Sequence, residues 1–159
     1  MIKQVDIENN LVYLYPSSLV VKDLPTKVHT ILGSCVAICL YDKTRKIGGI
    51  NHYMLPYWNG SGLETPKYGN IAIEKLIGGM ISLGSKKEHL VAKVFGGGAV
   101  LDVSTGSFNI GERNISVAID MLNQHKIPIV AKSTGGNKGR KIIFDTQTGE
   151  VIHRFIKSD

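Results

Sequence analysis

Apolar residues concentrate in two neighbouring runs near the start of the chain. Residues 28–41 (VHTILGSCVAICLY) are apolar and rich in β-branched side chains, a pattern that predicts a strand broken at Gly33-Ser34. The half after the break is apolar on every face, so periodicity leaves both a strand and a helix open there. Residues 46–55 (KIGGINHYML) predict a second strand. The polar residues 42–45 between the two runs predict a turn, and therefore a hairpin.

Two later segments, residues 70–83 and 109–125, predict helices. Each has apolar residues on one face at helical spacing: Ala72, Leu76, Met80 and Leu83 in the first, and Ile115, Ile119 and Leu122 in the second. Asn70 and Asn109 suit the N-caps of these helices, because an Asn side chain accepts a hydrogen bond from the first free backbone N–H groups. Gly84 suits the end of the first helix.

The remaining apolar runs predict strands. Residues 90–95 and 127–132 are short runs next to the helices, and residues 140–145 and 151–156 predict a hairpin. The order is strands, helix, strand, helix, strands. This order predicts an α+β fold, an α/β sandwich of mostly antiparallel sheets with two main flanking helices.

The composition fits a folded domain in a reducing compartment. The 159 residues suit a single domain, and the 43% of hydrophobic residues excludes a disordered chain. No apolar run approaches the roughly 20 residues that span a bilayer, and the first ten residues carry acids where a signal peptide is apolar. The two cysteines lie four positions apart, too close for a useful disulfide. We therefore expect a cytoplasmic protein without membrane insertion.

The charge is unevenly distributed. The net charge is +6, and residues 126–157 hold seven basic residues: Lys126, Lys132, Lys138, Arg140, Lys141, Arg154 and Lys157. A basic surface favours acidic partners, among them nucleic acid, acidic protein surfaces and lipid headgroups. Aromatic residues are only 7% and do not alternate with the basic ones as in a base-stacking surface. We expect a solvated basic face and no nucleic-acid partner.

Three polar segments leave alternatives open. Residues 57–68 (YWNGSGLETPKY) predict a loop whose Trp58 either lies on a partner surface or packs into the core. Residues 109–114 (NIGERN) and 134–140 (TGGNKGR) are turn-like and rich in hydrogen-bonding side chains. Their Asn and Arg side chains are expected to satisfy buried loop carbonyls. Both segments also remain candidates for the border of a functional site.

Cys35 and His52 are the residues most suited to chemistry. Cys35 follows the Gly33-Ser34 bend, where backbone N–H groups can stabilise a thiolate or an oxyanion. His52 lies in the second apolar run, and a hairpin would let it face Cys35 as the base that a thiol nucleophile needs. The alternatives are a cysteine packed in the core, as expected for Cys39, and a structural histidine.

The sequence does not indicate a metal or a nucleotide. The C-x3-C spacing of Cys35 and Cys39 lacks a second matched pair of ligands. The other histidines are scattered singly and are expected to be structural or exposed: His29, His89, His125 and His153. The glycine-rich segments at residues 79–86 and 96–98 do not have phosphate-loop spacing. We expect no metal and no cofactor.

Six motifs follow one another, in order, along nearly the whole of the chain after residue 28. They are LGSCVAICLYD (32–42), HYMLP (52–56), KYGNIAIEKLI (67–77), FGGGA (95–99), NIGERN (109–114) and TGGNKGR (134–140). Together they resemble the CheD family, the chemoreceptor glutamine deamidases of bacterial and archaeal chemotaxis.

The resemblance implies one CheD-like deamidase domain over residues 1–159, with a fold akin to the catalytic domain of the cytotoxic necrotising factor toxins. The family's nucleophile maps onto Cys35, its histidine onto His52 and its threonine onto Thr30. It implies conversion of receptor glutamines to glutamate through a cysteine thioester, with ammonia release and no cofactor. It also implies two partners, the cytoplasmic helices of methyl-accepting chemotaxis receptors and a CheC-type phosphatase.

Two other functions remain open from the sequence. The chain could chiefly be a regulatory protein that binds and controls a CheC-type phosphatase, with deamidation secondary. It could also bind nucleic acid through its basic C-terminal third, with the steep salt dependence of such binding. The joint presence of Cys35 and His52 favours the enzyme, because a binding module needs neither.

Overall fold

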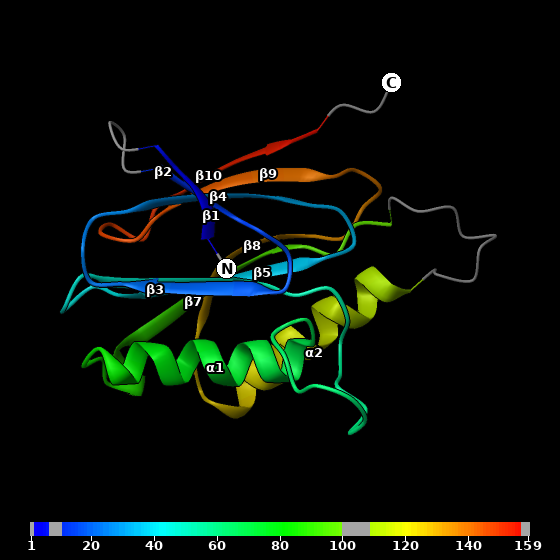
Figure 1. Ribbon diagram of the computed structural model, residues 1–159, viewed down its shortest axis with the longest axis horizontal. Coiled ribbons are helices and arrows are strands. Elements are labelled where there is room, and N and C mark those ends of the chain that lie inside the picture. The colour runs from blue at the N-terminus through cyan, green and yellow to red at the C-terminus, as the bar shows by residue number, and fades with distance from the viewer. Residues whose placement is uncertain (1, 7–10, 100–108, 157–159) are drawn as a thin grey trace.

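Two five-stranded β-sheets pack face to face, and two helices cover the outer face of one of them (Figure 1). The computed structural model describes residues 2–6, 11–99 and 109–156. Within these residues, sheet A has the strand order β1-β2-β4-β9-β10 and sheet B the order β3-β6-β5-β7-β8. The helices are α1 (Gly69–Ser82) and α2 (Ile110–Gln124), and a short 3-10 helix, η1 (Lys87–His89), follows α1.

The strands of sheet A are β1 (Ile2–Asp6), β2 (Leu11–Leu14), β4 (Lys27–Leu32), β9 (Arg140–Asp145) and β10 (Val151–Phe155). Those of sheet B are β3 (Ser18–Lys22), β5 (Val36–Asp42), β6 (Ile47–His52), β7 (Leu90–Gly96) and β8 (Ile129–Thr134). Most neighbours pair antiparallel, and only β2–β4 and β7–β8 pair parallel among the described strands.

Burial explains why the two sheets differ in sequence pattern. In β4 and β9 every second residue is buried, because one face packs inward and the other has no covering layer. In β6 all six residues are buried, because sheet B has sheet A on one face and the helices on the other. The continuous apolar runs of the sequence are therefore the central strands of sheet B.

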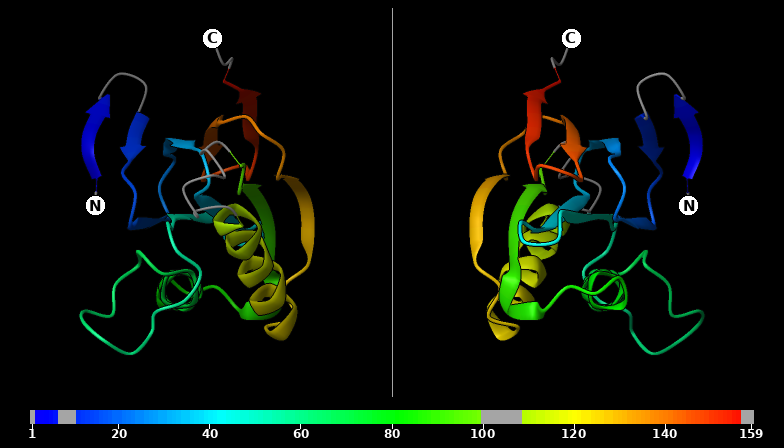
Figure 2. Two further views of the ribbon diagram at one scale, coloured as in Figure 1. Left: turned by 90° about the vertical axis from the view of Figure 1, so that its right-hand side faces the viewer. Right: turned by 90° about the vertical axis from the view of Figure 1, so that its left-hand side faces the viewer.

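Two apolar layers hold the sheets and helices together. Between the sheets lie buried side chains such as Leu14, Val28 and Phe144. Between sheet B and the helices lie others such as Ile38 and Leu76. Each fully buried side chain of this size contributes about 1.5–3 kcal/mol by leaving water. Figure 2 shows α1 and α2 side by side against the same face of sheet B.

The predicted fold class is confirmed, including the mostly antiparallel sheets and the two flanking helices. The segment after the Gly33-Ser34 bend is a strand, and it forms the expected hairpin with β6. Both helices and all the strands predicted after residue 89 are present, with ends shifted by at most two residues. Within the described residues, no helix is long and apolar enough to cross a membrane.

Gly84 does end α1, directly after its C-cap Leu83 and with a φ of +110°, but the N-terminal strands and the side-chain N-caps of the helices were not predicted correctly. The strands β1, β2 and β3 carried no prediction, because runs of four or five residues are too short to show a clear periodicity. Asn70 lies inside α1, whose N-cap is Tyr68. Asn109 does occupy the N-cap of α2, but its backbone is left-handed and its side chain makes no capping bond. Leu83 is 37% exposed rather than buried.

The buried face of α2 also differs from the prediction. Four side chains on this face are fully buried: Asn114, Val117, Ala118 and Leu122. Ile115 and Ile119 lie at the edge of this face and are only half-buried. The helix is therefore rotated so that a polar residue, Asn114, points into the protein.

Candidate active site

Cys35 lies at the bend between β4 of sheet A and β5 of sheet B, where the chain passes from one sheet to the other. Its side chain is half-buried. Its carbonyl oxygen accepts a hydrogen bond of 2.9 Å from the Gly97 N–H, and the Gly98 N–H donates to the Gly33 carbonyl at 2.9 Å. Gly96 has a φ of +109°, and a Cβ there would collide with the Cys35 carbonyl. The FGGG segment contains glycine because it must lie directly against this bend.

The pairing of β5 with β6 places Cys35 and His52 on the same face of sheet B. Val36 and Tyr53 exchange two backbone hydrogen bonds, of 3.0 and 3.1 Å, and Cys39 pairs with Ile50 in the same register. Cys39 faces the layer between the sheets, and Cys35 packs against the same apolar cluster. Because side chains alternate along a strand, His52 faces this layer too and lies diagonally from Cys35.

Thr30 of β4 approaches His52 from the opposite sheet. The Thr30 Oγ1 atom lies 2.7 Å from His52 Nδ1 and 2.7 Å from the Leu14 carbonyl oxygen. Thr30 is fully buried and His52 is 1% exposed. This hydrogen bond therefore crosses the layer between the two sheets.

The hydroxyl of Thr30 determines which nitrogen of His52 carries the proton. A hydroxyl has one hydrogen, and a carbonyl can only accept. Thr30 therefore donates to the Leu14 carbonyl and accepts from His52 Nδ1–H. In a neutral imidazole this leaves the lone pair on Nε2. His52 Nε2 is buried and has no hydrogen-bond partner among the described residues, so it is free to accept a proton.

Burial keeps both Cys35 and His52 uncharged at neutral pH. Desolvation lowers the pKa of His52 to about 4. Burial raises the pKa of the Cys35 thiol, and the hydrogen bond from its own backbone N–H opposes this only in part. At rest both groups are therefore neutral, a thiol and an imidazole, and no hydrogen bond joins them in the structure. In that state His52 can act as a general base.

Asn114 belongs to the NIGERN segment, for which the sequence favoured a structural role and left a place at the border of the site open. Its Nδ2 atom donates to the Ser34 carbonyl at 3.0 Å and to the Met54 carbonyl at 2.9 Å. Its own backbone carbonyl accepts a hydrogen bond from the Tyr53 hydroxyl. One amide of α2 thus ties the segment before Cys35 to the segment after His52. The expectation that such side chains satisfy loop carbonyls is confirmed, and the NIGERN segment does border the candidate site.

Asn51 adds a second contact beside His52. Its side-chain Oδ1 accepts the hydrogen bond from the Ile38 N–H at 2.8 Å. In this register the backbone carbonyl of Asn51 is the usual acceptor for that N–H. The side chain takes that place, so the ladder between β5 and β6 is irregular next to His52. The sequence signal was a polar residue inside an otherwise apolar strand.

The other predicted candidates lie away from this site. Cys39 is fully buried in the layer between the sheets, and burial raises its pKa far above that of an exposed thiol. His89 is exposed, and His29 and His153 make ring contacts with aromatic side chains. Trp58 is half-buried, and its loop extends away from the sheets (Figure 2). Within the described parts of the chain, no three potential ligands gather as a metal site would require.

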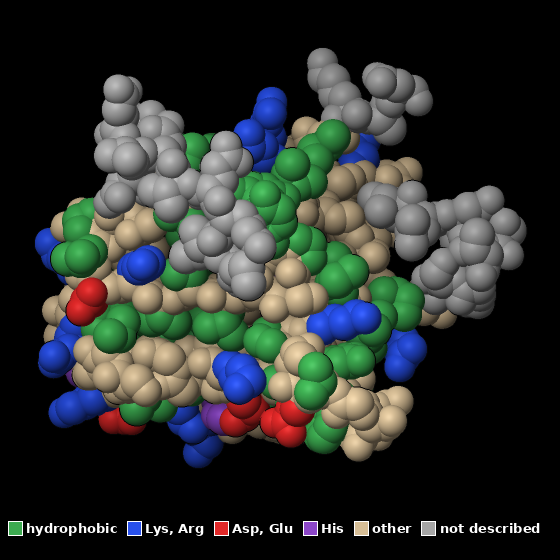
Figure 3. Space-filling view, viewed as in Figure 1, with side chains coloured by type: hydrophobic (Ala, Val, Ile, Leu, Met, Phe, Trp, Pro, Cys, Tyr) green, Lys and Arg blue, Asp and Glu red, His purple; other side chains and the backbone are tan. Residues whose placement is uncertain are grey.

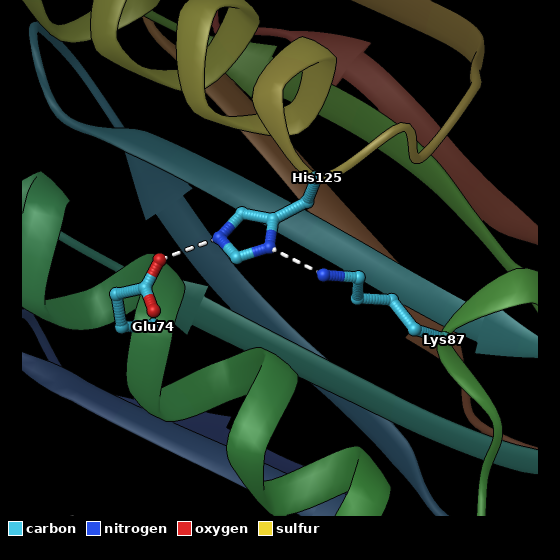
Figure 4. Close-up of polar contacts among 3 residues, drawn as sticks. All are labelled: Glu74, Lys87 and His125. Carbon is cyan, nitrogen blue, oxygen red and sulfur yellow. Dashed lines mark hydrogen bonds and ion pairs between the residues drawn. The ribbon is translucent and has the colours of Figure 1, made fainter.

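His125 belongs to a separate polar cluster on the helical side of the protein (Figure 4). Its Nε2 pairs with a carboxylate oxygen of Glu74 on α1, and its Nδ1 lies 3.0 Å from the Lys87 ammonium in η1. Glu74 is 57% exposed at its side chain. The cluster ties the end of α2 to α1 and η1, and an exposed pair of this kind contributes at most about 1 kcal/mol.

A half-buried cysteine and a buried histidine of fixed tautomer, on the same face of one sheet, are side chains that thiol-dependent acyl transfer uses. The family model for CheD chemotactic sensory transduction matches residues 54–155. Cys35 and His52 precede that range. The chain belongs to the CheD family, as its relatives also show.

Curated relatives match most of the chain. A protein of Trichlorobacter lovleyi named "Probable chemoreceptor glutamine deamidase CheD" is 50% identical over 88% of this chain and 87% of its own. Proteins of the same name from Sulfurimonas denitrificans and Methanococcus vannielii are 44% and 38% identical over 91% and 82% of this chain, and over 94% and 85% of their own. The predicted family is confirmed, and the predicted activity agrees with these names.

Proposed function

We propose that this protein is a chemoreceptor glutamine deamidase in which Cys35 is the nucleophile, His52 the base and Thr30 the residue that orients His52. One domain over residues 1–159 carries this activity in the cytoplasm. The observation that carries the proposal is the hydrogen-bond chain from the Leu14 carbonyl through Thr30 to His52 Nδ1. This hydrogen-bond chain leaves the Nε2 atom of His52 unprotonated, and His52 lies on the face of sheet B that also carries Cys35.

The reaction follows from the neutral resting pair. The thiol proton of Cys35 passes to His52 Nε2 as the sulfur attacks the carboxamide carbon of a glutamine side chain. Backbone N–H groups at the Gly33–Cys35 bend stabilise the oxyanion. His52 then gives its proton to the leaving nitrogen, and ammonia departs with a thioester left on Cys35. Water, deprotonated by His52, attacks the thioester and releases glutamate and the free thiol. Atoms and charges balance without a cofactor.

The neutral pair has a chemical consequence. A preformed thiolate would react with many electrophiles at rest. Here the thiol loses its proton only as the carboxamide is attacked, because burial disfavours both charged forms. During that step the imidazolium is stabilised by its Nδ1–H bond to Thr30, as in other triads whose third member orients the histidine.

The proposed partners are receptor helices and a CheC-type phosphatase. The names of the relatives support the first. The second follows only from the family resemblance. A pull-down with a CheC-type phosphatase from the same source tests it. If the Cys35→Ala variant still binds the phosphatase, phosphatase binding does not depend on catalysis.

The activity is tested with a purified chemoreceptor cytoplasmic fragment from the same source, by ammonia release and mass spectrometry. We expect a gain of about one dalton at specific glutamines, since deamidation replaces –NH₂ by –OH. Cys35→Ala and His52→Ala should abolish it. The matched control is Cys39→Ala, because Cys39 lies in the same layer but is fully buried and out of reach of a substrate, whereas Cys35 is half-buried. Full activity in Cys35→Ala, or loss of activity in a folded Cys39→Ala, would contradict the assignment.

A further inference from the structure

A basic hollow lies on the side of the protein where sheets A and B expose β8, β9 and β10. It has a volume of about 590 Å³, and its lining includes Lys132, Lys138, Arg140 and Phe155. Three of these four side chains are cationic, and none of the lining residues is acidic. We call this feature the Arg140 hollow.

Arg140 is a buried cation without a counter-charge. It is 3% exposed. Its guanidinium donates to the Ser133 hydroxyl at 3.1 Å and to the Gly135 carbonyl at 2.8 Å, both neutral acceptors, and it lies 5.0 Å from the centre of the Phe155 ring. The single ion pair of the described residues joins His125 to Glu74 and does not involve Arg140. A buried charge held only by neutral groups favours an anion nearby.

The hollow adjoins the bend that carries Cys35. Arg140 pairs with Leu32, the last residue of β4 before the bend. The Gly135 N–H donates to the Gly96 carbonyl at 2.9 Å, and the next residue, Gly97, donates to the Cys35 carbonyl. The TGGNKGR loop and the cysteine bend are thus attached to the same glycine segment.

The surface charge agrees with this placement. In Figure 3 the visible Asp and Glu side chains lie in the lower half of the molecule, toward the helices, while Lys and Arg side chains are spread over both halves. Lys132 and Lys138 are exposed at the hollow. They are free to turn toward an anion that Arg140 alone cannot reach.

We propose that the Arg140 hollow binds a carboxylate side chain of the substrate protein, close to the glutamine that reacts at Cys35. The proposal rests on the proposed function and adds a substrate preference to it: glutamines flanked by Asp or Glu react best. The hollow is a shallow depression lined by eight residues, and its one aromatic ring is already packed on Arg140. Both features favour a single carboxylate over a nucleic-acid strand.

The test compares two synthetic helical peptides that share one reactive glutamine and differ only in flanking Glu or Gln residues. The wild type should deamidate the Glu-flanked peptide with a kcat/KM about five- to tenfold higher, mainly through KM, and the difference should shrink at high salt. The double variant Lys132→Glu/Lys138→Glu should lose the preference. These lysines are exposed, so the variant folds.

The matched control is Lys43→Glu/Lys75→Glu, which makes the same change of net charge at exposed positions outside the hollow. It should keep the preference. Arg140→Lys serves as a second test of the buried cation, with the rate of Cys35 alkylation by iodoacetamide as the check that the thiol is unchanged.

Failure of this proposal is distinguishable from failure of the proposed function. Cys35→Ala cannot turn over, so its affinity for the two peptides, measured by fluorescence anisotropy, reports the hollow alone. Equal affinities there, an unchanged preference in Lys132→Glu/Lys138→Glu, or tighter binding of duplex DNA than of the acidic peptide would each overturn the carboxylate site. Absence of turnover in the wild type with a retained affinity difference would overturn the deamidase alone.

Discussion

At the scale of single residues, Thr30 decides what His52 can do. A neutral histidine has two tautomers, and only the one protonated on Nδ1 leaves Nε2 as a base. Thr30 selects that tautomer because its one hydrogen is used on the Leu14 carbonyl. The sequence resemblance pointed to Thr30, but its role as an acceptor follows only from the two distances.

Replacing the hydroxyl should therefore lower turnover without changing substrate binding. Thr30→Val keeps the shape of the side chain and removes both hydrogen bonds. We expect kcat to fall about 10- to 100-fold, since an unmade buried hydrogen bond costs about 1–3 kcal/mol, with KM little changed. Thr30→Ser should restore most of kcat. A fall in KM and kcat together, or a Thr30→Ser variant as slow as Thr30→Val, would speak against an orienting role.

The low pKa of His52 predicts an unusual pH profile. With a pKa of about 4, about nine-tenths of His52 is neutral at pH 5, against about 3% for a histidine of ordinary pKa. The acid limb of kcat/KM should therefore lie near pH 4 rather than near pH 6.5. In contrast, alkylation of Cys35 should need a higher pH than alkylation of an exposed thiol, because burial raises the pKa of the Cys35 thiol. A midpoint near pH 6.5 in brief kinetic assays would contradict this prediction.

The same pKa has a consequence for stability. The unfolded chain binds a proton at His52 below about pH 6.5, whereas the folded chain does so only below about 4. The contribution of His52 to the free energy of unfolding is therefore fully present above pH 6.5. It falls as the pH drops from about 6.5 to about 4, and about 3 kcal/mol is lost below that range. Urea unfolding of His52→Gln should lack this part of the pH dependence.

At the scale of elements, one helix holds the two halves of the site together. Asn114 of α2 bonds to carbonyls on both sides, at Ser34 and Met54. The sequence contained a signal for this. Positions 114, 117, 118 and 122 form an ideal i, i+3, i+4, i+8 stripe, and a lone Asn on such a stripe is a buried polar residue in need of partners. Asn114 was missed because Ile115 and Ile119 were assigned to the buried face of this helix.

Substitutions at Asn114 should affect both stability and chemistry. Asn114→Ala removes the donor to the partly buried Ser34 and Met54 carbonyls, and we expect a loss of about 1–3 kcal/mol in the free energy of unfolding. We also expect slower deamidation at temperatures where the variant is fully folded. Asn123→Ala is the control, because Asn123 lies on the exposed face of the same helix. Equal effects from the two variants would exclude a special role for Asn114.

The elements were predictable to different degrees for physical reasons. The strands β5 and β6 are buried on both faces, which explains their continuous apolar runs. Such a run alone fits a strand or a helix, and the polar turn between the two runs is what indicated a hairpin of strands. The edge strands β1 and β3 are short, and β3 gains its structure by pairing with β6, a distant segment that no local pattern indicates. The strand β1 pairs with β2, which follows it directly in the chain, but both runs are too short for a pattern that predicts strands.

At the scale of the whole molecule, the site exists only because two sheets pack together. Thr30 belongs to sheet A and His52 to sheet B, and the hydrogen bond between them crosses the inter-sheet layer. Neither sheet alone contains the orienting bond. The family resemblance pointed to both residues, but the distance between them depends on long-range packing that no sequence motif encodes.

The two apolar layers should therefore differ in their effect on turnover. Ile142 lies opposite Thr30 in the ladder and packs between the sheets, whereas Ile73 packs between sheet B and the helices. Both are fully buried, so each change to Ala should cost about 2–5 kcal/mol in urea unfolding. Only Ile142→Ala should also lower kcat, because only it loosens the layer that holds Thr30 against His52. If Ile73→Ala lowers kcat as much at a temperature where both variants are folded, general destabilisation, and not the inter-sheet layer, controls the site.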